Sequence, residues 1–172
     1  MVEQLKLPHI SSGELLRSAV REGTALGLRA KAVMDRGELI SDDIMLELIK
    51  ERLSQDDANV GFILDGYPRN TAQAVALDAL LTQLDKPLDE ALQIDVDIEK
   101  VIERIVLRAS KEGRSDDSEA VARKRMRVYA EQTAPVADYY AGNGMLTRVL
   151  GMGTIEEVFH RLMAVLQIRS ES

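Results

Sequence analysis

The segment with the most distinctive chemistry is GFILDGYPR, at residues 61–69. Its apolar residues 62–64 predict a short strand that runs directly into Asp65 and Gly66, and Arg69 follows the turn. A buried strand that ends in a carboxylate places that acid at the carboxyl edge of a parallel sheet, where open α/β folds bind their ligands. There the carboxylate suits a water bound to Mg²⁺, and the guanidinium suits a phosphate. The alternative is a strand followed by an ordinary turn.

A second segment, HISSGELLR at residues 9–17, has the pattern of a short strand, a Ser/Gly turn and a helix start. Free backbone N–H groups at such a helix start favour an anion. Ser12 and Arg17 would add a hydroxyl and a guanidinium to that site. A simple capped helix, with Ser11 and Glu14 as a capping box, explains the segment equally well.

Basic side chains are bunched in an acidic chain whose formal net charge is −7. They lie at Arg104, Arg108, Lys111, Arg114, Arg123, Lys124, Arg125 and Arg127. An acidic protein with one basic segment argues against general nucleic-acid binding and favours a small anionic ligand. The basic stripe on the helix expected near residues 97–111 also fits a merely solvated face.

Arg125 stands out because it falls in the middle of an apolar helical stripe that includes Ala122 and Val128. A guanidinium in such surroundings needs a partner. Two interpretations are open, a buried salt bridge to Asp116 or Asp117 and a phosphate clamp.

Composition narrows the classes of protein and the kinds of site that remain possible. The chain has no Cys and two His, which excludes disulfides and disfavours a zinc cluster. It has no run of about 18 apolar residues, so we expect no membrane span, and its first residues lack the regions of a signal peptide. Residues 61–66 have the glycine spacing of a phosphate loop, but Tyr67 stands where that motif requires Lys. We therefore expect a cytoplasmic protein with one core and a small inserted lobe.

The elements that would position these residues alternate along the chain. Hydrophobic periodicity and N-cap signals, including Asn70 with Gln73 and Thr154 with Glu157, predict helices near residues 13–22, 25–35, 42–54, 71–84, 97–111, 117–132, 133–141 and 155–168. Strands are expected near residues 8–10, 61–65, 91–95 and 145–150. This alternation predicts an α/β fold with a parallel sheet.

Taken together, these segments resemble the adenylate kinase family of the bacterial short-lid type, over essentially the whole chain. The resemblance is carried by HISSGELLR, MDRGELISDD, GFILDGYPRNTAQA, GRSDD, RKRMRVY and QTAPVADYY. It implies a P-loop-kinase-like parallel sheet flanked by helices, a helical AMP-binding lobe at about residues 12–54 and a short lid at about 109–118. It also implies direct phosphoryl transfer, ATP + AMP ⇌ 2 ADP, by a cytoplasmic monomer that uses ATP with Mg²⁺ and no zinc.

The resemblance further implies the roles of individual residues on the AMP side. Ser12, where the family usually has Thr, and Arg17 resemble a pair in the AMP site. The turn around the adenine of AMP corresponds to Gly37, Leu39 and Ile40. The contacts to the phosphate and adenine of AMP correspond to Gly66, Arg69 and Gln73.

On the ATP side the resemblance assigns charge stabilisation to several arginines. The expected catalytic set is Arg69, Arg104, Arg108, Arg114 and Arg125, which favours the phosphate interpretation of Arg125. Asp65 resembles the acid that holds Mg²⁺ through water, and Gly151 and Met152 resemble the backbone beside the adenine of ATP.

The sequence departs from the family pattern at its beginning. The family starts with a strand and a Gly-rich Walker A loop that ends in Gly-Lys, and the sequence given does not contain them. The strand would lie between those at residues 61–65 and 91–95. Without it we expect two exposed inner strand edges, an apolar groove, possible self-association and impaired catalysis. An incomplete sequence, a true deletion and a binding remnant are all compatible with this departure.

Two alternatives to the kinase activity therefore stay open. One is a non-catalytic module that keeps only AMP binding. The other is a kinase for a different nucleoside monophosphate, although Gln73 and the turn at Leu39 and Ile40 favour adenine.

Overall fold

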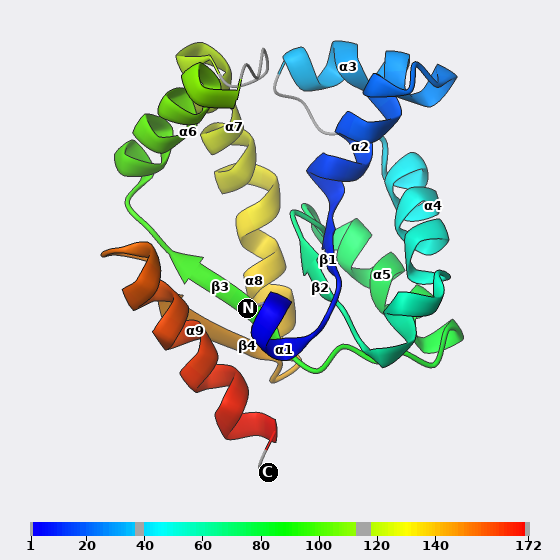
Figure 1. Ribbon diagram of the computed structural model, residues 1–172, viewed down its shortest axis with the longest axis vertical. Helices are drawn as coiled ribbons and strands as arrows, with labels where there is room; N and C mark the ends of the chain where they lie inside the picture. Colours follow the sequence, from blue (N-terminus) through cyan, green and yellow to red (C-terminus); the bar gives the residue numbers. More distant parts are fainter. Residues whose placement is uncertain (1, 37–39, 113–117, 171–172) are drawn as a thin grey trace.

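The chain folds into two halves that face each other across a cavity (Figure 1). The computed structural model describes residues 2–36, 40–112 and 118–170. The first half contains α1 (Val2–Leu5), β1 (His9–Ser11), α2 (Ser12–Arg21), α3 (Ala25–Asp35), α4 (Asp42–Leu53), the 3₁₀ turn η1 (Asp56–Val60), β2 (Ile63–Asp65) and α5 (Thr71–Gln83). The second contains β3 (Ala91–Asp95), α6 (Ile98–Glu112), α7 (Glu119–Val128), the π-helical segment η3 (Tyr129–Thr133), α8 (Ala134–Gly142), β4 (Leu146–Leu150) and α9 (Ile155–Ser170).

The strands form parallel pairs, as the alternation of elements predicts. Among the described residues, β1 pairs with β2, with His9 opposite Ile63, and β3 pairs with β4, with Ala91 opposite Leu146. The two pairs are separate sheets, and a cavity of about 1300 Å³ lies between β2 and β3. Residues of both strands line this cavity, so the expected groove between them is present. The fold class is therefore mixed α/β, with short parallel sheets flanked by helices.

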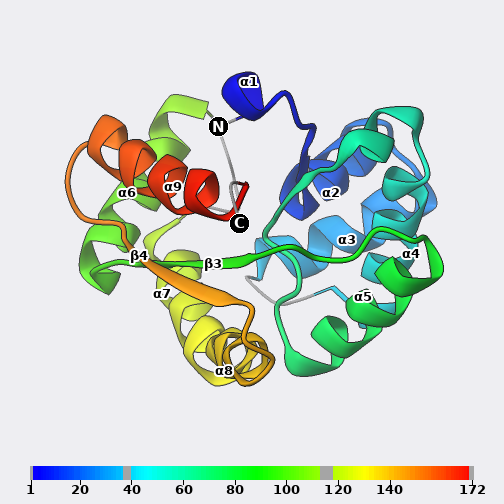
Figure 2. The same ribbon diagram turned by 90° about the horizontal axis from the view of Figure 1, so that it is seen from below.

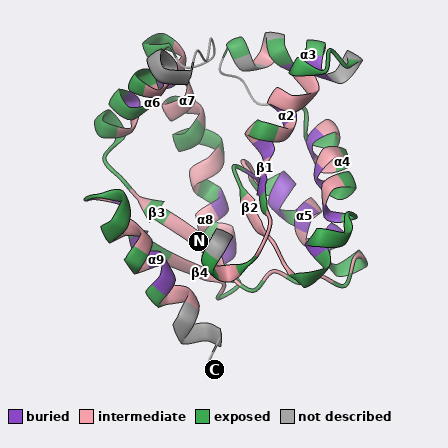
Figure 3. Cartoon of the chain, in the orientation of Figure 1, coloured by how far each residue is buried: buried purple, intermediate pink, exposed green. Residues whose placement is uncertain are grey.

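Helices cover the two sheets differently. The β3–β4 sheet lies between α9 on one face and α8 on the other (Figure 2). The main core belongs to the first half, where Ile10, Ile49, Leu53 and Leu77 are almost completely buried. Figure 3 shows this buried region along β1, α4 and α5, whereas α6 is largely exposed. Among the described residues, no helix is long and apolar enough to cross a lipid bilayer.

The helix-start signals have mixed outcomes. Asn70 accepts a hydrogen bond from the backbone N–H of Gln73, and Thr154 forms the predicted reciprocal capping box with Glu157. The capping box predicted at Ser11 is wrong, because the Ser11 side chain makes no cap hydrogen bond and Glu14 pairs with Arg17 instead.

The helix predicted at residues 117–132 ends early in the structure. After Val128 the chain widens into the π-helical segment η3 before α8 begins with Ala134 and Pro135. Proline lacks an N–H group and its ring crowds the carbonyl four residues earlier, which here is that of Glu131. A widened turn relieves this conflict and lets the chain continue directly into α8. The widened turn also matters for the cavity, because Thr133 Oγ1 donates to the backbone oxygen of Arg69 at 2.8 Å.

Candidate active site

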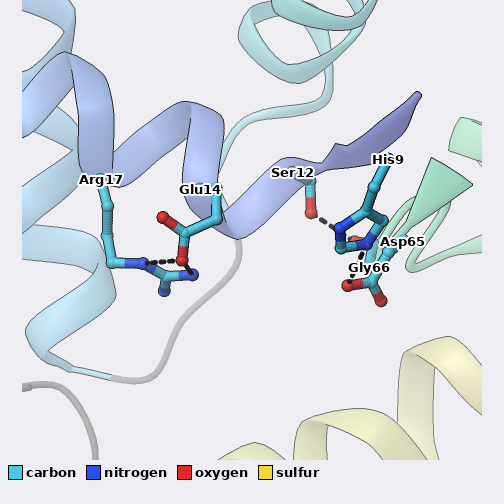
Figure 4. A network of polar contacts seen from close by, with 6 residues as sticks. All are labelled: His9, Ser12, Glu14, Arg17, Asp65 and Gly66. Atoms are coloured by element: carbon cyan, nitrogen blue, oxygen red, sulfur yellow. Dashed lines mark hydrogen bonds and ion pairs between the residues drawn. The ribbon is translucent and has the colours of Figure 1, made fainter. Parts of the chain in front are cut away.

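The cavity opens where β1 and β2 end, and a short hydrogen bond ties these ends together. Ser12 is 2% exposed, and its Oγ donates to the backbone oxygen of Gly66 at 2.7 Å (Figure 4). Gly66 has φ of +72°, and a Cβ built there would lie 2.8 Å from Ser12 Oγ. Only glycine fits both the backbone conformation and the close approach. The loop after β2 is therefore fixed against the start of α2.

Asp65 ends β2, as the sequence predicts, and it lines the cavity. Its Oδ2 lies 3.2 Å from His9 Nε2, and both side chains are exposed. Among the described residues, no group of three or more His, Asp or Glu side chains could hold a metal ion. Mg²⁺ commonly keeps several waters and uses one or two carboxylates together with substrate phosphates. A single accessible carboxylate fits that pattern, so Asp65 suits Mg²⁺ that arrives on a nucleotide.

Guanidinium groups from four elements line the cavity. They come from α2, the β2–α5 loop, α6 and α7, and belong to Arg17, Arg69, Arg108 and Arg125. Burial lowers the pKa of Arg69, the charge of Arg125 lowers it further, and the charge of Arg17 adds to the effect. The opposing charge of Asp65 offsets part of this shift. Like charges gathered at one cavity favour the binding of an anion with several oxygens, such as a phosphate.

Hydrogen bonds hold both the side chain and the backbone of Arg69. Its Nε donates to the backbone oxygen of Gly66 at 2.7 Å, and its own backbone oxygen accepts the Thr133 hydrogen bond. Arg17 is oriented differently, because its Nε donates to Glu14 Oε1 at 2.9 Å. Both arginines therefore reach the cavity in defined positions.

A closed network of amide groups borders the same cavity. Gln73 is 2% exposed, and its Oε1 accepts from the backbone N–H of Arg69 at 2.7 Å. Its Nε2 donates to Asp42 Oδ1 at 2.8 Å. Asn70 Nδ2 also donates to Asp42 Oδ1, at 3.0 Å. Local sequence patterns do not single out Asp42, because its partner Gln73 lies far along the chain.

Tyr67 brings an unusual hydroxyl to the cavity. The residue is 6% exposed, and its hydroxyl makes no hydrogen bond to any described residue. Burial and, secondarily, the charge of Asp42 raise the pKa of Tyr67 to about 12. A buried hydroxyl without a partner destabilises the folded state.

We therefore expect Tyr67→Phe to raise the free energy of unfolding by about 1 kcal/mol, since it removes only the unpartnered group. Denaturant unfolding of the ligand-free protein measures this change. Tyr140→Phe is the matched control and should destabilise, because the Tyr140 hydroxyl donates to Asp78 Oδ1 at 3.2 Å. A loss of stability in Tyr67→Phe similar to that in the control would contradict the prediction.

Other residues expected in the site have different surroundings. Ile40 is buried and lines the cavity. Arg104 is exposed on α6 and is not among the residues that line the cavity. Gly151 and Met152 follow β4 and are not among the lining residues either. The remaining three, Gly37, Leu39 and Arg114, lie outside the described residues.

The local surroundings explain why residue 151 is glycine and show how the backbone of Met152 is held. A Cβ at Gly151 would come 2.3 Å from Ile94 Cγ2, so the close approach of β3 requires glycine. The Met152 backbone oxygen accepts from Arg161 Nη1 at 2.6 Å. These contacts support the β4–α9 connection whether or not a nucleotide lies beside it.

Comparison with known proteins gives one consistent result. The protein-family model described as "Adenylate kinase" matches residues 1–145 of this chain. An adenylate kinase from Stenotrophomonas maltophilia strain K279a is 50% identical over 96% of this chain and 88% of its own length. One from Xanthomonas oryzae pv. oryzae strain MAFF 311018 is 52% identical over 95% of this chain and 88% of its own length. A third, from Xanthomonas euvesicatoria pv. vesicatoria strain 85-10, is 52% identical over 93% of this chain and 86% of its own length.

Proposed function

Because this chain belongs to the adenylate kinase family, we propose that its cavity binds AMP at the ends of β1 and β2 and receives the transferred phosphoryl group between its arginines. The family reaction is reversible phosphoryl transfer, ATP + AMP ⇌ 2 ADP, and its members use Mg²⁺. The observation that supports the proposal most directly is the gathering of Arg17, Arg69 and Arg125 at one cavity.

On the AMP side, we assign the phosphate to the guanidinium groups of Arg17 and Arg69. Ser12 and Gly66 fix the loop that carries Arg69, through the hydrogen bond between them. Gln73 and Ile40 would border the adenine, together with Gly37 and Leu39, which lie outside the described residues. Residues at about 12–54 would form the AMP-binding lobe.

The chemistry itself needs positioning and charge stabilisation, because the phosphoryl group passes directly between two oxygens. Arg69, Arg108 and Arg125 line the cavity and would balance the charge that spreads over the group in transfer. Mg²⁺ bound to ATP would supply further charge neutralisation, with Asp65 holding one of its waters. Arg104 and Arg114 would join this set when the lid at about residues 109–118 closes and excludes water. Gly151 and Met152 would lie beside the adenine of ATP.

The direct test is the formation of ADP from ATP and AMP by the purified chain in the presence of Mg²⁺. Turnover that depends on both nucleotides is expected. Folded protein that binds AMP but shows no turnover would instead favour the binding module. Folded protein that binds neither nucleotide would reject the proposed site.

Adenylate kinases bind small nucleotides and are typically monomeric, and we place this chain with its nucleotides in the cytoplasm. We also propose that it self-associates, because the described strands leave the inner edges of β2 and β3 without a strand partner. Sedimentation velocity should then show a coefficient that rises with protein concentration. A compact monomer at every concentration would contradict this prediction.

A further inference from the structure

The side-chain amide of Gln73 has only one orientation that satisfies its neighbours. The oxygen and nitrogen of such an amide are assigned from the hydrogen-bond network rather than seen directly. Here the backbone N–H of Arg69 can only donate, and the carboxylate of Asp42 accepts. Turning the amide over would place two donors face to face at Arg69 and two acceptors face to face at Asp42. The network therefore fixes which atom of the amide lies where.

Asp42 is itself held in place. It is the first residue of α4, where the helix dipole favours a negative charge. Asn70 Nδ2 donates to both of its oxygens, at 3.0 and 3.3 Å, and Asn70 Oδ1 accepts from the backbone N–H of Gln73 at 2.8 Å. The carboxylate thus connects α4 to the first turn of α5. Its position is set by the fold rather than by the ligand.

The fixed amide retains hydrogen-bonding capacity. Gln73 lines the cavity, and its amide can make four hydrogen bonds. Contacts with described residues use one hydrogen of Nε2 and one lone pair of Oε1. One hydrogen of Nε2 and one lone pair of Oε1 therefore remain unused by the described residues, and Asp42 determines which end of the amide carries each.

We propose that Asp42 is a specificity-determining, positioning residue that makes the site select a 6-aminopurine nucleotide over a 6-oxopurine nucleotide. Adenine presents an amino donor at C6 beside an acceptor at N1. Hypoxanthine has nearly the same shape, but it presents an acceptor at C6 beside a donor at N1. An amide that turns over freely would pair with either base, whereas a fixed amide pairs with one and opposes the other. This inference rests on the proposed AMP site.

The size of the effect follows from the cost of a mismatch. A site that is built to hydrogen-bond a polar group rejects an analogue that leaves its buried partners unpaired much more strongly than it rejects a change of one methylene. In Asp42→Asn the new amide can donate to Gln73 as well as accept from it. The turned-over orientation of Gln73 then no longer places two acceptors face to face at residue 42, although two donors still meet at Arg69. The selectivity between the two bases should therefore shrink rather than vanish.

The test measures equilibrium affinities of AMP and IMP by calorimetry for the whole chain, so it does not require turnover. The ratio of the two dissociation constants should fall about tenfold in Asp42→Asn. Because the ratio is taken within one variant, a general loss of stability or affinity affects both ligands alike. Asp43→Asn is the matched control, since the next residue makes the same change of charge at the same helix start, and its ratio should stay at the wild-type value.

Gln73→Ala distinguishes a failure of the role of Asp42 from a failure of the proposed AMP site. If Gln73→Ala removes the selectivity while Asp42→Asn keeps the wild-type ratio, the role of Asp42 is rejected and the AMP site stands. If Gln73→Ala changes neither the AMP affinity nor the ratio, the AMP site itself is wrong and the inference falls with it. Equal reductions of the ratio in Asp42→Asn and Asp43→Asn would also overturn the inference, because a general charge effect would then explain it.

Discussion

Replacing Arg69 with alanine is expected to weaken AMP binding about 100-fold, since the site that we propose would lose charge-assisted hydrogen bonds to the phosphate. The catalytic efficiency should fall further, by about 10³-fold, because arginines that face a transferring phosphoryl group contribute most in the transition state. Both quantities are measured on the same preparation, by calorimetry with AMP and by the rate of ADP formation.

The position of Arg69 explains why this effect should exceed that of other arginines. Burial and the nearby charges of Arg125 and Arg17 lower its pKa, so its free energy in the empty site is less favourable than in water. An anion that binds there relieves this electrostatic penalty. The gain from binding is therefore larger than for an exposed guanidinium, where solvent screens most of the interaction.

Two control variants make the prediction specific. Arg69→Lys keeps the charge but loses the planar fork and the Nε–H that donates to Gly66, so it should recover only part of the affinity. Arg127→Ala removes the same charge from an exposed position on α7 and should leave AMP binding close to wild type. Unchanged AMP affinity in Arg69→Ala, with the fold intact by circular dichroism, would remove Arg69 from the proposed site.

The regular elements could be predicted because local patterns determine them. The strand expected at residues 91–95 is β3, and the helix expected at 25–35 is α3, each with the predicted bounds. Asn70 also caps α5 as its sequence spacing indicates. In these cases the interactions that set the element lie within a few residues of one another, so the sequence displays them directly.

Local patterns indicate the positions of the candidate site residues most directly where these follow the ends of strands. Ser11 lies opposite Asp65, and Ser12 contacts Gly66, because parallel strands place their carboxyl ends at one edge. The hydrogen bond between Asp42 and Gln73 joins two helices, and periodicity within either helix does not indicate it. The capping box at Ser11 failed for a different, local reason, because Arg17 competes for Glu14 and forms a charged pair with it.

The contact between α5 and α8 gives the second large effect, on stability rather than binding. Asp78→Ala is expected to lower the free energy of unfolding by about 2–4 kcal/mol. Hydrogen bonds to charged groups contribute about 1.5–3 kcal/mol each, and water replaces part of the two lost bonds because both are only partly buried. Asp78 Oδ2 accepts from the Tyr139 hydroxyl at 2.8 Å, and Asp78 Oδ1 accepts from the Tyr140 hydroxyl at 3.2 Å. Denaturant unfolding measures the loss, and Asp138→Ala, an exposed acid on α8, should change stability little.

The pH dependence of stability distinguishes this contact from a general packing effect. The hydrogen bond to Asp78 raises the pKa of Tyr139, and burial followed by the charge of Asp78 raises that of Tyr140. Because both pKa values are raised in the folded state, the unfolded chain loses its tyrosine protons first as the pH rises. The stability that these groups contribute is complete below pH 10, the ordinary tyrosine pKa, and declines above it. The stability difference between wild type and Asp78→Ala should therefore narrow above pH 10, and a difference that stays constant there would show that the tyrosine hydroxyls do not carry the effect.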